Sequence, residues 1–198
     1  MHVDAAFGGF AALSPGHARL LDGLGEADSV CVDLHKWLNV PYDSAVQLTR
    51  RPDLQVRVFR NAAPYLGMPG DDPDFVHLTP ESSRRLRALA AWFSLTAYGQ
   101  EGHAEIVARN IASAHRLAQR LARLPGVRLL APVRLNVVCF TVAGDVADVV
   151  ERVAAEGEAF VTPTVYQGEP AIRAAFSNWR TTEADDDRIF AALQRALP

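Results

Sequence analysis

Lysine is almost absent from this sequence: it occurs once, at position 36, against 19 arginines. A globular protein of this length would ordinarily contain about ten lysines. Arginine can replace lysine wherever a solvated positive charge suffices, but it cannot lose its proton and form an imine, as a lysine amine can. Lys36 is therefore either the chance remainder of an arginine-rich composition or a position that requires amine chemistry.

The sequence also has no long apolar run, only two cysteines and a small net charge. No apolar run reaches the roughly 18 residues of a membrane-spanning helix, and no secretory signal pattern opens the chain. The net charge of -3 does not favour a nucleic acid or an anionic membrane as partner. Cys31 and Cys139 lie in apolar strand-like runs, and no Cys/His pattern has zinc spacing. We therefore expect two buried thiols rather than a disulfide, no metal site and a cytoplasmic location.

The chain has the composition of a soluble globular protein, with 49% apolar and 22% charged residues, and its 198 residues allow one large or two small domains. A short helix is predicted over residues 18–24, and buried strands over 29–33 and 44–49. Residues 57–79 contain several prolines and glycines, which predicts a long loop of the kind that is often functional.

Two helices are predicted after this loop, over residues 81–98 and 101–124, with Gly99 between them. Strands and helices then alternate, which predicts a small α/β domain with helices on one face of a sheet. The predicted strands are 127–130, 137–142, 159–165 and 172–176, and the predicted helices are 146–156 and 183–197. We expect the domains to be 1–80 and 125–198, connected by the helices of 81–124.

Asp4 ends one strand-like segment and Lys36 follows another, 32 positions further along the chain. That interval is long enough for a crossover between parallel strands, whose carboxyl ends collect ligands in open α/β sheets. An enzyme that uses pyridoxal phosphate (PLP) needs a lysine amine to form an imine with the aldehyde. It also needs a carboxylate that keeps the pyridine nitrogen protonated. Lys36 and Asp4 are candidates for these two groups.

Two motifs carry a specific resemblance. His2-Val3-Asp4-Ala5-Ala6-Phe7-Gly8-Gly9 resembles the cofactor-aspartate motif of the group II PLP-dependent amino-acid decarboxylases, and Ala27-Asp28-Ser29-Val30-Cys31-Val32-Asp33-Leu34-His35-Lys36-Trp37 resembles their lysine motif. The resemblance implies PLP as cofactor and a fold-type-I α/β structure. By this resemblance Asp4 meets the pyridine nitrogen, Ala6 packs on the ring, His35 lies near the phosphate and Lys36 forms the imine. An isolated aspartate or histidine at a strand end would more often be a structural residue.

Later segments extend the resemblance over the rest of the chain. Asn61-Ala62-Ala63-Pro64-Tyr65-Leu66 is similar to the family's mobile catalytic loop, which makes Tyr65 the proton donor to the substrate carbon after CO2 leaves. Relatives that make aldehydes tend to have phenylalanine there, so Tyr65 favours simple decarboxylation. The resemblance gives Arg84 and Arg85 a structural role between the loop, the following helix and a partner subunit. Arg173 is the candidate for pairing with a substrate carboxylate or, alternatively, a structural ion pair. Thr181-Thr182-Glu183 is a helix start of the capping type.

The resemblance is to the C-terminal half of the family, which includes aromatic-L-amino-acid and glutamate decarboxylases. Relatives have a preceding segment with a phosphate-binding turn and a histidine that stacks on the ring. We therefore expect truncated fold type I, self-association through an exposed strand edge, and little activity until a front half is supplied. The expected function is decarboxylation of an L-amino acid, as a homodimer in the full-length enzyme. A non-catalytic interaction subunit, an aminotransferase and an aldehyde synthase remain alternatives.

Overall fold

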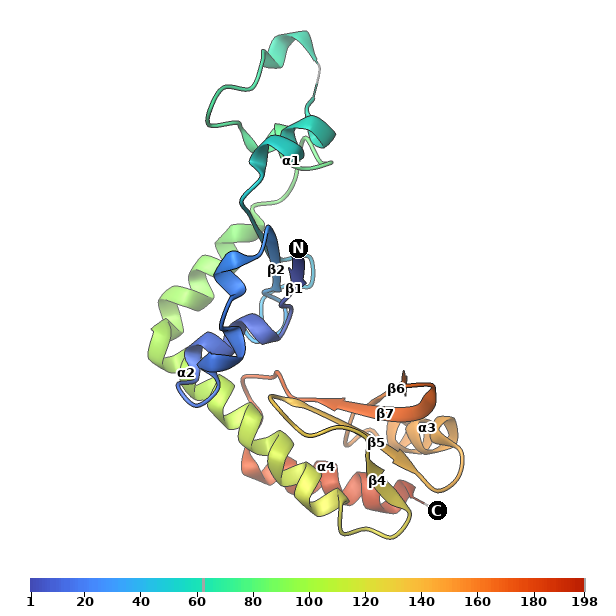
Figure 1. Cartoon of the computed structure of the whole chain (residues 1–198). Helices are drawn as coiled ribbons and strands as arrows, with labels where there is room; N and C mark the ends of the chain where they lie inside the picture. Colours follow the sequence, from blue (N-terminus) through green and yellow to red (C-terminus); the bar gives the residue numbers. More distant parts are fainter. Residues whose placement is uncertain (62, 198) are drawn as a thin grey trace.

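The computed structural model describes residues 1–61 and 63–197. Ala62, in the predicted loop motif, and Pro198, at the end of the predicted C-terminal domain, lie outside the described residues. The described chain is a mixed α/β structure with two separate sheets and a long helix, α2, beside both of them (Figure 1).

The first sheet has the order β1-β2-β3. Its strands are β1 (His2–Asp4), β2 (Ser29–Asp33) and β3 (Ala45–Thr49). β1 and β2 are parallel, as the spacing of Asp4 and Lys36 predicts, whereas β3 is antiparallel to β2. The crossover contains three 3-10 helices (Gly8–Leu13, Ala18–Leu21 and Leu24–Glu26) in place of the single short helix predicted over 18–24. The crossover between parallel strands β1 and β2 is confirmed, and β3 adds an antiparallel strand on the other side of β2.

The second sheet has the order β4-β5-β7-β6, and all its neighbouring strands are antiparallel. Its elements are β4 (Val127–Leu129), β5 (Val137–Val142), α3 (Val146–Glu156), β6 (Thr162–Tyr166), β7 (Glu169–Ala175) and α4 (Glu183–Ala196). A two-residue hairpin joins β6 to β7, and both of its residues, Gln167 and Gly168, have positive φ. That backbone matches a type I′ turn. β6 begins three residues later than predicted, and β7 begins three residues earlier.

Alternate residues of the second sheet face the helices. Val138, Phe140 and Val142 of β5 are buried in one apolar core with residues of α3, α4 and the C-terminal part of α2. The period of two along β5 therefore matches a sheet that is covered on one face, as predicted. Cys31 and Cys139 lie in different sheets as free thiols and are half-buried, so the expectation that both are buried is wrong.

Helix α2 runs from Arg87 to Leu121 and bends at Gly99, whose φ of 61° and ψ of -173° are not helical. The predicted break at Gly99 is confirmed, but the helix begins six residues later than predicted. Residues 81–86 are not helical and contain a bend at Ser82 and Ser83, residues that favour local turns over helix. Because α2 contributes residues to the cores beside both sheets, the domain boundaries stay predictions.

The loop begins three residues later than predicted, because residues 57–59 belong to helix α1 (Pro52–Phe59). Pro52 occupies a first-turn position, which suits its fixed φ. Figure 1 shows α1 and the following segment projecting away from both sheets. This segment contains two short 3-10 helices, Pro64–Leu66 and Phe75–His77.

A capping box begins α4. The Asp185 carboxylate accepts hydrogen bonds from the backbone N–H and the hydroxyl of Thr182, at 2.9 and 2.8 Å. These bonds lower the pKa of Asp185, so their stabilisation is present above the unfolded pKa of about 3.9 and is lost as pH falls through the folded value. We expect Thr182→Ala to reduce the free energy of unfolding by about 1 kcal/mol, and Thr181→Ala to change it less. Urea denaturation at neutral pH measures both, and equal losses would contradict the assignment.

Candidate cofactor site

The two motifs meet at one edge of the first sheet. Asp4 is opposite Cys31 in the parallel pair β1–β2, so the carboxyl ends of both strands lie together. The Asp4 side chain is exposed, and its Oδ1 accepts hydrogen bonds from the Ala6 N–H at 3.1 Å and the Cys31 thiol at 3.7 Å. Burial, and then the nearby Asp4 charge, raise the pKa of Cys31. Asp4 is therefore an accessible carboxylate held by a local turn at the strand end.

Lys36 lies in the turn after β2. Its Nζ atom is 2.9 Å from Asp33 Oδ2 and 4.4 Å from the centroid of the Phe7 ring, and its side chain is 23% exposed. Neither Asp33 nor Phe7 was predicted as a site residue, although both stand inside the quoted motifs. The three-residue spacing of Asp33 and Lys36 in a turn was the signal that could have identified this pair.

His35 packs on the side of the same turn. Its ring stacks on the Tyr42 ring with centroids 4.5 Å apart and an interplanar angle of 17°. Its Nε2 atom is 3.8 Å from Asp33 Oδ2, and its buried Nδ1 atom has no hydrogen-bond partner among the described residues. His35 is thus oriented by an aromatic contact that the sequence patterns did not indicate.

A cavity of about 360 Å³ joins this turn to the second sheet. Arg173 of β7 reaches it, and the Arg173 guanidinium carbon lies 5.7 Å from the Phe7 ring centroid. The Phe7 ring therefore contacts two cations, Lys36 and Arg173, and the cavity can attract an anionic group. Its lining residues are Phe7, His35, Lys36, Tyr42, Phe160, Val161, Thr162, Arg173, Ala175 and Ser177.

The predicted site residues fall into three groups. Lys36, His35 and Arg173 line the cavity. Asp4 and Ala6 lie at the same sheet edge but do not line it. Tyr65 belongs to the projecting segment, where its side chain is 85% exposed, and it does not line the cavity either. The structure thus brings the cofactor motifs together and leaves Tyr65 apart from them.

The residues at this edge fit PLP. Lys36 places an amine at the cavity, Asp4 offers an accessible carboxylate at the neighbouring strand end, and the unpaired Nδ1 of His35 is a further polar atom. No group of three or more His, Cys, Asp or Glu side chains arranged to hold a metal ion occurs within residues 1–61 and 63–197. Over the same residues, no helix is long and apolar enough to cross a bilayer.

Known proteins resemble the chain along nearly all of its length. Residues 1–143 match the pyridoxal-dependent decarboxylase conserved domain. Identity to the aromatic-L-amino-acid decarboxylase of Drosophila lebanonensis is 34%, over 73% of this chain and 36% of that protein. Identity to the Sus scrofa enzyme of the same name is 31%, over 96% of this chain and 40% of that protein.

Solved structures agree with this match at the level of the fold. A crystal structure of Oryza sativa TDC with PLP and tryptamine matches 98% of this chain and 44% of its own, with a TM-score of 0.85 and 24% identity. The described part is therefore a portion of fold type I. The chain spans about two fifths of the length of the two curated relatives named above. The conserved-domain match contains both the aspartate and the lysine motif, and the chain belongs to the family of pyridoxal-dependent decarboxylases.

Proposed function

We propose that this chain supplies the lysine, the pyridinium-pairing aspartate and a substrate-binding arginine of an enzyme that converts an L-amino acid to its amine and CO2. The observation that carries the proposal is the position of Lys36, the only lysine, at a cavity that Arg173 also lines. PLP, when bound, draws electrons from the substrate carbon into its ring. The remaining steps are assigned to residues of this chain.

Lys36 must be neutral to attack an aldehyde, and Asp33 is the acceptor nearest to its ammonium group. We assign Asp33 to holding the Lys36 proton before the reaction and Asp4 to keeping the pyridine nitrogen protonated. His35, stacked on Tyr42, is assigned to the cofactor phosphate, and Ala6 to contact with the ring. Arg173, which also lies near the Phe7 ring, is assigned to orienting the substrate carboxylate, because a planar guanidinium can donate two parallel hydrogen bonds to a carboxylate.

Tyr65 is proposed to return a proton to the substrate carbon. In the described structure it is exposed and lies outside the cavity, so this role requires the loop to close over a site. A phenol on a closing loop can deliver the proton while it excludes water. We also propose a homodimer, which the exposed apolar side chains Leu89, Trp92 and Phe93 of α2 support. The two free thiols support a cytoplasmic location.

The function is tested by product analysis. The chain is joined to the front segment of a relative, supplied with PLP and given a panel of aromatic and acidic L-amino acids. We expect amine and CO2 in equal amounts, and a loss of about 10² to 10⁴ in rate for Tyr65→Phe, because a positioned proton donor contributes a factor of that size. Tyr166→Phe, in β6 and outside the cavity, is the matched control. A keto acid or an aldehyde as the main wild-type product would contradict decarboxylation, and no turnover at all would favour a non-catalytic subunit.

Arg173 gives a separate prediction. We expect Arg173→Ala to raise KM about 10-fold to 100-fold, since a hydrogen bond to a charged group contributes roughly 1.5–3 kcal/mol and each 1.4 kcal/mol is a factor of ten. Arg173→Lys should recover part of the loss. Arg128→Ala, which removes an exposed arginine paired with Glu169 on the second sheet, serves as the control. An unchanged KM in steady-state kinetics of Arg173→Ala would assign Arg173 to a structural role.

A further inference from the structure

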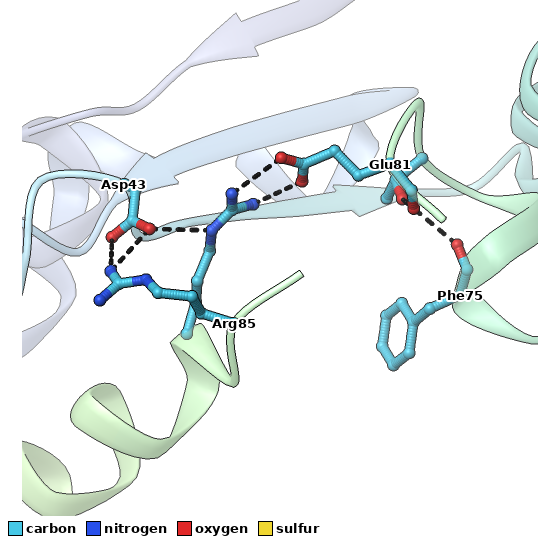
Figure 2. A network of polar contacts seen from close by, with 6 residues as sticks. Asp43, Phe75, Glu81 and Arg85 are labelled. Carbon is cyan, nitrogen blue, oxygen red and sulfur yellow. Dashed lines mark hydrogen bonds and ion pairs between the residues drawn. The ribbon is translucent and has the colours of Figure 1, made fainter. Parts of the chain in front are cut away.

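A charged network joins the base of the Tyr65 segment to the turn that follows Lys36 (Figure 2). The Asp43 carboxylate accepts hydrogen bonds from Arg85 at 2.7 Å to both oxygens and from Arg87 Nε at 3.1 Å. The other side of the Arg87 guanidinium binds both oxygens of Glu81, at 2.7 and 2.9 Å. Arg87 therefore bridges two carboxylates that lie 38 positions apart in the sequence, one at each side of the Tyr65 segment.

The same base is tied together locally. Asn61 donates a hydrogen bond from Nδ2 to the Ser82 hydroxyl at 3.1 Å, which links the beginning and the end of the projecting segment. The Thr79 hydroxyl reaches the carbonyl oxygens of Phe75 and Glu81, at 3.3 and 3.2 Å (Figure 2). These contacts tie residues 75–87 into a folded base for the projecting segment, which we call the hinge.

Asp43 lies between two residues that contact His35. Tyr42, immediately before it, stacks on the His35 ring, and the Ser44 carbonyl oxygen, immediately after it, accepts hydrogen bonds from the backbone N–H groups of Leu34 and His35. A displacement of Asp43 therefore changes the support of His35 from both sides. The contacts run from Glu81 through Arg87 to Asp43. From Asp43 they reach the turn that contains Lys36 through its chain neighbours Tyr42 and Ser44.

Helix stability alone does not explain the two arginines. Arg85 and Arg87 lie at the N-terminal end of α2, where the helix dipole disfavours positive charge, and the first turn of α2 contains no acidic residue. The hydrogen bond from Arg85 lowers the pKa of Asp43, and that from Arg87 lowers the pKa of Glu81. The carboxylates of Asp43 and Glu81 thus offset the unfavourable positive charge at the N-terminal end of α2.

We propose that Asp43 and Arg87 are positioning residues, which couple the hinge of the Tyr65 segment to the orientation of His35 beside Lys36. When the segment moves, Arg87 transmits the change to Asp43 and so to the Tyr42–His35 stack. A catalytic role for this coupling rests on the proposed function. The coupling itself can be tested separately, because both measurements are made on the chain without substrate or cofactor.

The experiment compares Glu81→Gln and Asp43→Asn with the wild-type chain by two measurements. Amide hydrogen exchange of residues 63–86 should increase about twofold to fivefold in each variant, the effect expected of an exposed ion pair. The NMR signals of the His35 imidazole, assigned with a His35→Gln variant, should shift in both. The Glu81→Gln result is decisive because, among the described residues, Glu81 reaches the turn that contains Lys36 only through its ion pair with Arg87.

Asp53→Asn is the matched control, since Asp53 pairs with Arg51 only two residues away, and it should leave the His35 signals unchanged. Asp43→Glu should restore both readouts toward wild type. Faster exchange in Glu81→Gln with unchanged His35 signals would overturn the coupling and leave a merely local hinge. Unchanged exchange in both variants would overturn the network's role in the hinge itself.

Discussion

Lys36→Arg is expected to abolish decarboxylation by this chain when it is joined to the front segment of a relative. Arginine keeps the positive charge beside Asp33 and Phe7, but its guanidinium does not lose a proton and cannot form an imine. Forming and releasing the imine also requires proton transfers to and from the lysine amine, and proton transfer by a positioned side chain contributes about 10² to 10⁴. We therefore expect CO2 release to fall by at least about 100-fold.

A control separates loss of chemistry from loss of structure. Arg57→Lys adds a second lysine on the exposed surface of α1, away from the cavity, and should not change the rate. Circular dichroism should show the same folded content for both variants. Residual activity of Lys36→Arg above one tenth of wild type, with both variants folded, would mean that Lys36 is not the reacting amine.

Phe140→Ala is expected to have the largest effect on stability. Phe140 is fully buried in the core formed by β5, β7, α2, α3 and α4, where it pairs in register with Ile172. Removing a buried phenylalanine side chain costs about 3–5 kcal/mol, part of it from the cavity left behind. Because the unfolding free energy of a domain is only about 5–15 kcal/mol, we expect the second sheet and its helices to be largely unfolded near 37 °C.

Phe75→Ala is the comparison variant, since Phe75 is 70% exposed in the projecting segment. It should change the midpoint of thermal unfolding by much less than Phe140→Ala. Differential scanning calorimetry or denaturant titration measures both. Equal losses for the two phenylalanines would contradict the placement of the core beside the second sheet.

The cofactor motifs were predictable from sequence because their chemistry depends on residue type and spacing. Asp4 and Lys36 lie at neighbouring ends of parallel strands, as a crossover of that length requires. The alternating burial along β5 and the bend of α2 at Gly99 could be predicted from the sequence in the same way. Each of these features follows from local patterns that tertiary packing did not override.

Other features depend on contacts between distant residues, which one sequence does not reveal. Arg87, at the start of α2, pairs with Asp43, 44 positions earlier, and no helix-propensity argument includes that partner. Tyr42 and Asp33 are unremarkable residues until the turn places them beside His35 and Lys36. The roles of Asp4, Ala6, His35, Lys36, Tyr65 and Arg173 stay predictions, although three of them line one cavity.

Borohydride trapping measures whether Lys36 is the amine that reacts with PLP. The chain is incubated with excess PLP, reduced with sodium borohydride, digested with trypsin and mapped by mass spectrometry. Only two primary amines exist, the Lys36 side chain and the N-terminus, and the latter pairs with Asp28. We expect the reduced cofactor on the tryptic peptide of residues 20–50, which contains Lys36. Label confined to the N-terminal amine would contradict it.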